Sequence, residues 1–347
     1  MNRSPPALIA EPAGDYEATR ALLSDPESFR PKPRSIEAVE THMSHVFLAG
    51  DRVYKMKKPI HLGFVDFTSL ASRRANCERE FMLNQRLAPG VYLETVPVVR
   101  TKEGSLQLGG AGEPVEWLLV MARLDREQQL DKAILRAEAS PAQIDALCDL
   151  LAGFYRETER IKVSPEEWID WWREAVDLNA VSLRDPLFDL PRELVERVVE
   201  GEATFLADRS ELLAARARDG RILDGHGDLR PEHVHLGPPL RLIDRLEFNA
   251  RLRWIDPFDE VAFLGMECDR LGAGWIGPRL IEGLAERLHD RPPPALLDFY
   301  TGHRAAMRAR LSIEHMRDPN PRTPERWPRQ ARTYLEMAAA ALARLQS

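Results

Sequence analysis

The sequence predicts an α+β protein in which a small antiparallel sheet precedes a larger, mainly helical part. Strand-like segments separated by glycine turns fill residues 36–122. Apolar residues at helical spacing dominate residues 124–347. The strands and the helices are segregated along the chain rather than alternating, which is typical of α+β folds. The length of 347 residues suffices for two ordinary domains or one large two-lobed domain.

The elements are expected in the following order. Residues 1–36 form a proline-rich extension with one short helix near residues 16–23. The Gly50-Asp51 pair between two apolar runs predicts a hairpin, with strands at 46–49 and 52–56. The remaining segments are expected as a helix at 68–87, strands at 91–99, 105–108 and 115–121, and helices at 140–160, 166–180, 191–218, 258–271, 275–289, 294–316 and 328–345, with a short extended stretch at 221–242.

The composition excludes several classes of protein. Apolar residues make up 44% of the chain and charged residues 30%, which is globular composition. The longest apolar runs are too short to span a bilayer, so we expect no membrane partner. The net charge of −7 argues against general nucleic-acid binding. The three cysteines lie far apart without CxxC spacing, which argues against a disulfide scaffold or zinc finger and favours a cytoplasmic location.

Two polar segments, at residues 226–236 and 242–248, are the strongest candidates for chemistry. Each places an acid at the edge of an apolar, strand-like stretch. Two short strands that return on one another would bring Asp228, His233 and Asp244 close together. Acids in such a cluster suit a divalent cation and an attacking hydroxyl group.

The run His-Gly-Asp-Leu-Arg-Pro-Glu-His at residues 226–233 resembles the catalytic loop of the aminoglycoside phosphotransferase family, within the protein-kinase-like superfamily. The resemblance implies that Asp228 accepts or orients the proton of the substrate hydroxyl, and that His233 and Asp244 bind the metal. It also implies a two-lobed fold, with an N-terminal extension at 1–36, a nucleotide-binding N-lobe at 37–122 and a C-lobe at 123–347 that carries the catalytic loop and substrate-binding helices.

The amino-terminal part of the chain is consistent with the same resemblance. Lys55 in Val-Tyr-Lys looks like the strand lysine that holds the α- and β-phosphates of ATP. The resemblance implies that a glutamate of the following helix pairs with it, and we favour Glu80 over Glu78. Main-chain groups near Met121 and Ala122 are expected to meet the adenine.

The sequence departs from the family pattern in two places. No GxGxxG precedes Lys55; Thr41-His-Met-Ser44-His takes its place, and Ser44 is expected to offer its hydroxyl and amide to phosphate. The other departure is His233, where most relatives carry Asn. Imidazole is a poor ligand for Mg²⁺, so Asp244 holds most of the metal, Mn²⁺ is used, or turnover is slow. Some relatives with Thr-His-x-Ser before the lysine are fused to an ATP-binding domain, and because no GxxxxGK[ST] occurs here we expect that domain to be absent.

The resemblance implies an ATP-dependent enzyme, using Mg²⁺ or Mn²⁺, that moves the γ-phosphate to a hydroxyl of a sugar, amino sugar or related small metabolite. Two alternatives stay open at this point. One is a nucleotide-binding pseudokinase without turnover. The other is a metal-dependent hydrolase, which leaves Lys55 and Glu80 unexplained and whose ligands would be His226, Asp228, His233, His235 and Asp244. The neighbouring Lys57 and Lys58 are expected to be solvated rather than functional.

Overall fold

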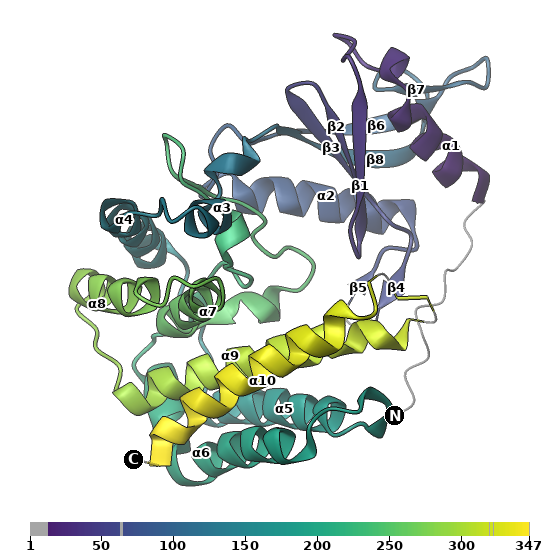
Figure 1. Ribbon diagram of the computed structural model, residues 1–347. Helices are drawn as coiled ribbons and strands as arrows, with labels where there is room; N and C mark the ends of the chain where they lie inside the picture. Colours follow the sequence, from purple (N-terminus) through teal and green to yellow (C-terminus); the bar gives the residue numbers. More distant parts are fainter. Residues whose placement is uncertain (1–12, 63–64, 319, 322, 347) are drawn as a thin grey trace. The chain divides into compact units, whose positions relative to one another are not determined.

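The structure is a computed structural model that describes residues 13–62, 65–318, 320–321 and 323–346 (Figure 1). The chain divides into two compact units. The first comprises the described residues of 1–129 together with 233–250, and the second those of 130–232 and 251–347. A sheet dominates the first unit and helices dominate the second, so the predicted α+β class is confirmed.

The first unit is built on a six-stranded antiparallel sheet. Gly50, at φ +65°, forms the predicted turn between the second and third strands; this left-handed conformation is accessible to glycine without strain. In spatial order the strands are β1 (Ile36–Glu40), β2 (Ser44–Ala49), β3 (Arg52–Lys57), β8 (Glu113–Ala122), β6 (Tyr92–Arg100) and β7 (Leu106–Leu108).

Each face of this sheet carries its own apolar cluster. Leu118 and Val120 of β8 pack with Leu23 of the helix α1 (Ala13–Ser24), whereas Leu119 packs with Cys77 of the helix α2 (Leu70–Asn84). Successive side chains of a strand point to opposite faces, which explains this alternation. Tyr54 and Met56 of β3 belong to the α1 cluster. The lysines that alternate with them along β3 therefore belong to the face covered by α2.

Two pairs of very short strands complete the first unit. The strand β10 (Val234–His235) is antiparallel to β11 (Arg241–Leu242), which is the return of two short strands expected after the catalytic-loop motif. The pair β4 (His61–Leu62) and β5 (Val65–Asp66) was not predicted. Neither strand of that pair is long enough to show a period in the sequence.

The second unit is helical around one small strand pair, β9 (Leu223–Asp224) with β12 (Trp254–Ile255). Its core includes the fully buried Trp168 and Trp172. None of the described helices combines the length and the apolar character needed to cross a bilayer. The helices are α3 (Leu130–Leu135), α4 (Pro141–Glu157), α5 (Pro165–Leu183), α6 (Arg192–Arg218), α7 (Pro257–Arg270), α8 (Ile276–Leu288), α9 (Pro294–Glu314) and α10 (Arg326–Ala343), of which α3 was not predicted.

Candidate active site

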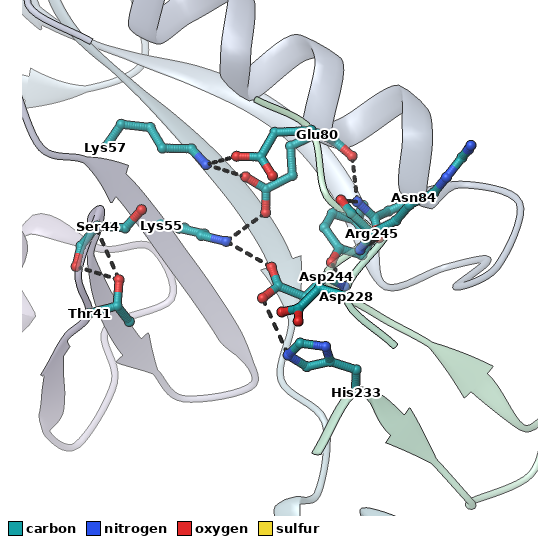
Figure 2. Close-up of polar contacts among 12 residues, drawn as sticks. Thr41, Ser44, Lys55, Lys57, Glu80, Asn84, Asp228, His233, Asp244 and Arg245 are labelled. Carbon is teal, nitrogen blue, oxygen red and sulfur yellow. Dashed lines mark hydrogen bonds and ion pairs between the residues drawn. The ribbon is translucent and has the colours of Figure 1, made fainter. Parts of the chain in front are cut away.

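Lys55 lies at the centre of a charged cluster in the first unit (Figure 2). Its Nζ is 2.7 Å from Oε1 of Glu80 on α2 and 3.1 Å from Oδ1 of Asp244, which follows β11. Three residues that the sequence analysis singled out are therefore in direct contact. Glu78, the other glutamate considered, pairs with Arg74 instead.

The cluster is largely withdrawn from water except at Asp244. The side chain of Lys55 is 15% exposed and that of Glu80 fully buried, whereas that of Asp244 is 43% exposed. The Lys55 ammonium holds the pKa of the Asp244 carboxyl well below its usual range. Burial opposes the charge on Lys55, but the carboxylates of Asp244 and Glu80 outweigh it and raise the pKa of the lysine. The cluster therefore presents an ionised carboxylate to a ligand at neutral pH.

Lys57 forms a second ion-paired group, which shares Glu80 with the first. The expectation that Lys57 is solvated is therefore wrong. Its side chain is 1% exposed, and its Nζ lies 2.5 Å from Oε2 of Glu80 and 2.6 Å from Oε1 of Glu247. Glu80 is thus shared by both lysines. The sequence held a signal for this arrangement, because residues two apart in a strand share a face and Lys57 follows Lys55 at that spacing. Glu247 was likewise missed, although it lies three residues after Asp244.

The backbone around Asp244 is held by side chains of the same unit. Asp244 has a left-handed conformation with φ +63°, which is uncommon for a residue with a side chain. Its amide donates a hydrogen bond to the Tyr92 hydroxyl at 2.9 Å, and the amide of Arg245 donates to Oδ1 of Asn84 at 3.0 Å. These two bonds tie the Asp244 turn to the sheet and to the end of α2.

His233 lies beside Asp244, with 3.6 Å between its Nε2 and Oδ2 of the aspartate, and its side chain is 7% exposed. The amide of Ile243 donates to the His233 carbonyl at 3.0 Å, which fixes the approach of the two segments. Mg²⁺ is commonly held by one or two carboxylates together with substrate phosphates and water. One carboxylate with a neighbouring imidazole fits a divalent ion that arrives with a nucleotide.

The hydrolase alternative requires a richer set of ligands. Within the part of the chain that the structure describes, no group of three or more histidine, cysteine, aspartate or glutamate side chains is placed to hold a metal ion. A protein-held metal that activates water typically has three protein ligands. The ion pairs of Lys55 and Glu80 remain outside that alternative.

The proposed catalytic loop belongs to the second unit, where Asp228 follows Gly227 at φ +89°. The Asp228 side chain is 34% exposed. Nε of Arg230 donates to Oδ2 of Asp228 at 3.1 Å, and Nη1 of the same arginine donates to Glu232 at 2.6 Å. Arg230 therefore helps to orient the aspartate. Arg230 belongs to the motif at residues 226–233, but the sequence pattern alone did not indicate this role.

Glu260, in the first turn of α7, binds the backbone of the same loop. Its carboxylate accepts hydrogen bonds from the amides of His226 at 3.1 Å and Gly227 at 2.6 Å, and from the Tyr155 hydroxyl at 2.7 Å. Burial raises the pKa of Glu260. Glu260 therefore supports the backbone of the loop at two consecutive residues.

The structure gives the remaining candidates the following surroundings. The Ser44 amide donates to Oγ1 of Thr41 at 3.0 Å, and the Ser44 side chain is buried. The Ala122 amide donates to the Val91 carbonyl at 2.7 Å, so it is already used within the sheet. Met121 is half-buried against the apolar cluster on the α2 face, as is Ile243, the residue before Asp244. The phosphate role of Ser44 and the adenine contacts of Met121 and Ala122 stay predictions.

Comparison with known sequences finds relatives of longer chain. No family model matches this chain. It is similar to an uncharacterised protein of Mycobacterium tuberculosis and to one of Mycobacterium bovis, each 35% identical over 289 residues. These alignments cover 80% of this chain and 54% of each relative. The chain thus spans about half the length of the curated relatives it matches.

Comparison with solved structures finds likenesses over nearly the whole chain. A choline/ethanolamine kinase family protein from Mesorhizobium loti is 13% identical with a TM-score of 0.52, over 95% of this chain and 100% of that one. The GDP complex of an aminoglycoside 2′-phosphotransferase-IIIa variant is 15% identical with a TM-score of 0.54, over 96% and 99%. A ternary complex of the aminoglycoside phosphotransferase APH(4)-Ia with AMP-PNP and hygromycin B is 13% identical with a TM-score of 0.53, over 93% and 98%. At these identities the likeness is one of fold.

Proposed function

We propose that this chain, which has the protein-kinase-like fold seen in aminoglycoside phosphotransferases and choline kinases, transfers the γ-phosphate of ATP to a hydroxyl group of a small molecule. The observation that carries this proposal is the position of Lys55 between Glu80 and Asp244, at 2.7 and 3.1 Å. A strand lysine held by a helix glutamate, next to a metal-binding aspartate, is the recurring arrangement for phosphoryl transfer in kinases.

The first unit supplies the nucleotide-binding groups in this proposal. Lys55 donates to the α- and β-phosphates while Glu80 keeps its ammonium in position. Asp244, with His233 beside it, holds Mg²⁺ or Mn²⁺. The ion neutralises charge on the phosphates when it is bound. Half-buried Met121 and Ile243 offer an apolar surface for the adenine, next to the charged cluster.

The second unit supplies the group that acts on the acceptor. Asp228 accepts a hydrogen bond from the acceptor hydroxyl and directs its oxygen towards the γ-phosphorus. Arg230 and Glu260 are positioning residues, because they hold the aspartate and the loop backbone respectively. Most of the rate acceleration then comes from positioning and electrostatic stabilisation.

We further propose that the acceptor is small, as a sugar, amino sugar or related metabolite is. Residues 251–258 run through β12 directly into α7, and the chain offers no insertion there for docking a peptide. The solved structures of like fold include one with hygromycin B, an aminoglycoside, which supports the same class.

The proposal is tested by turnover and nucleotide binding measured on the same variants. A library of hydroxylated metabolites is incubated with ATP and either Mg²⁺ or Mn²⁺, and the phosphorylated product is detected by mass spectrometry. Asp228→Asn is expected to lower kcat by about a hundredfold or more while leaving the nucleotide-induced rise in Tm intact. Lys55→Met and Asp244→Asn are expected to reduce that rise. Asp208→Asn, at an exposed site on α6, serves as the matched control.

Three outcomes would contradict parts of the proposal. Unchanged turnover in Asp228→Asn would remove that residue from the mechanism. An unchanged nucleotide shift in Lys55→Met would remove the lysine from the binding site. Nucleotide binding without product from any acceptor, in either metal, would favour the pseudokinase.

A further inference from the structure

A second cationic site lies in the second unit, outside the catalytic loop. A hollow of about 450 Å³ opens where α4 and α8 end and β9 begins, and its lining includes four arginines, Arg156, Arg160, Arg221 and Arg287. No residue of the 226–233 motif is among those that line it. The chain as a whole carries a net charge of −7, so the hollow is a local concentration of positive charge on an acidic protein.

The one carboxylate that lines the hollow does not neutralise it. Both oxygens of Asp290 accept hydrogen bonds from Arg216, at 2.7 Å each, and this pair is nearly buried. Arg287 is likewise engaged, because its Nε donates to Asp149 at 2.7 Å. The positive charge of the other lining arginines is therefore left without a full partner.

Three guanidinium groups remain available to a ligand. Among the described residues, the side chains of Arg156 and Arg160 have no hydrogen bond or ion pair. Nε of Arg221 is buried and has no hydrogen-bond partner within the described residues, while its Nη1 reaches Asp290 only at 3.5 Å. A buried donor left unsatisfied costs free energy that a bound acceptor recovers.

We propose that this hollow binds a small oxyanion with two or more negative charges. The planar donors of arginine match phosphate and carboxylate oxygens and make short, charge-assisted hydrogen bonds to them. Several such groups converging on one hollow favour a multivalent anion over a monovalent one, because each added charge finds its own guanidinium. Phosphate and carboxylate compounds share this chemistry, and the experiment below separates them.

The hollow is connected to the catalytic loop through hydrogen bonds of the backbone. The amide of Ile161 donates to the Ile222 carbonyl at 2.9 Å, and that of Asp224 donates to Glu159 at 3.2 Å. Arg160 and Arg221 belong to these two paired segments, and the second segment continues through β9 into Gly227. An anion held by both arginines links the segments and reduces their local opening. An anion bound in the hollow is therefore expected to steady the loop that begins at Gly227 as well.

The test is calorimetric titration of the full chain, without metal and at constant ionic strength, with pyrophosphate and separately with citrate. The double variant Arg156→Gln/Arg160→Gln is expected to raise Kd about tenfold or more, since it removes two charge-assisted partners. The control Arg192→Gln/Arg197→Gln removes two exposed arginines from α6 and is expected to change Kd by less than about twofold. Hydrogen exchange of residues 221–225 is expected to slow on binding in the wild type but not in the double variant of the hollow.

Lys55→Met distinguishes this hollow from the proposed nucleotide site. Binding that survives Lys55→Met and is lost in the arginine double variant supports the hollow, whatever the fate of the phosphotransferase proposal. A response to one probe alone identifies the anion group and also supports it. No heat with either probe, or loss of binding in Lys55→Met with retention in the double variant, would overturn the inference. Circular dichroism and Tm verify that both double variants are folded.

Discussion

At the scale of single residues, Lys57 gives the charged cluster of the first unit its rigidity. It donates to Glu80 and Glu247, and all three side chains are almost completely buried. Burial costs the free energy of hydration of each charge, and only close, well-aligned partners recover it. Lys57 thereby fixes Oε2 of Glu80, while Oε1 of the same carboxylate contacts Lys55. In the proposed phosphotransferase, Lys57 would contribute through the position of Glu80.

Replacement of Lys57 by methionine is expected to destabilise the protein by about 3–5 kcal/mol, because it leaves the buried Glu247 and half of Glu80 without a cation. Urea denaturation measures the loss. Lys58→Met is the matched control, since its partner Glu40 is 36% exposed, and about 0–1 kcal/mol is expected there. Equal stabilities of the two variants would show that the buried pair carries no special weight.

The lowered pKa of Asp244 predicts how the free energy of unfolding depends on pH. Its pKa is lowered in the folded protein, chiefly by Lys55, so it adds stability above the pKa of an unfolded aspartate, about 3.9. That stability is lost as the pH falls below this value towards the folded-state pKa. The advantage of the wild type over Asp244→Asn is therefore expected to be largest at neutral pH and to shrink below about pH 4.

The measurement is urea denaturation of both proteins at several pH values between 7 and 2.5. The 43% exposure of Asp244 reduces the size of the effect without changing its sign. Asp208→Asn, at an exposed position on α6, is expected to follow the wild type at every pH. An advantage that grew as the pH fell would contradict the proposed ion pairing.

At the scale of elements, the helix α7 connects the core of the second unit to the proposed catalytic loop. Glu260 stands in its first turn, where the unpaired amides of a helix favour a negative charge. The same carboxylate accepts two backbone hydrogen bonds from the loop. The position of the loop thus depends on a helix that follows it by about thirty residues.

Glu260→Gln replaces one of the two acceptors by a donor and is expected to speed hydrogen exchange at His226 and Gly227. Exchange of the peptide that spans residues 223–230, followed by mass spectrometry, measures this. Tyr155→Phe removes only the hydroxyl that donates to Glu260. The peptide 223–230 is therefore expected to exchange much more slowly in Tyr155→Phe than in Glu260→Gln. Identical exchange in wild type and Glu260→Gln would assign the loop's protection to other contacts.

At the scale of the whole molecule, the cysteines report on the integrity of both units. Cys77 lies in the first unit, Cys148 and Cys268 in the second, and all three are free and buried. Burial raises the pKa of Cys77 to about 12 and that of Cys148 to about 11, and it raises that of Cys268 as well. The thiolate, which is the reactive form, is therefore suppressed in the folded chain.

The native protein is expected to react negligibly with Ellman's reagent at pH 8. After denaturation in guanidinium chloride, all three thiols are expected to react, which releases three equivalents of thionitrobenzoate per chain. Partial urea denaturation then distinguishes opening of the first unit from opening of the second, since serine substitution at Cys77 removes the signal of the first alone. Rapid reaction of any thiol in the native protein would show that the residues packed around it open locally without global unfolding.

The order of elements could be predicted from local sequence signals. The strands of the main hairpin, the helix that carries Glu80 and the long helices after residue 140 show clear periodicity or caps, such as the Ser140–Gln143 capping box. The short elements β4, β5 and α3 could not be predicted, because so few residues establish no period. The burial of Lys57 required knowing that α2 covers that face of β3 and brings a carboxylate to it.

The sequence by itself determined the α+β class and the order of its main elements, and it indicated Lys55, Asp228 and Asp244 as candidate site residues. The structure confirmed the favoured pairing of Glu80 with Lys55. Only the tertiary structure decided that Lys57 lies in a buried network and that the arginines near Asp290 are only partly neutralised. Periodicity and capping depend on neighbours within a few residues along the chain. Ion pairing depends on distance in space and on loss of hydration, and chain folding alone brings residues 23 or 190 positions apart to within 2.6 Å.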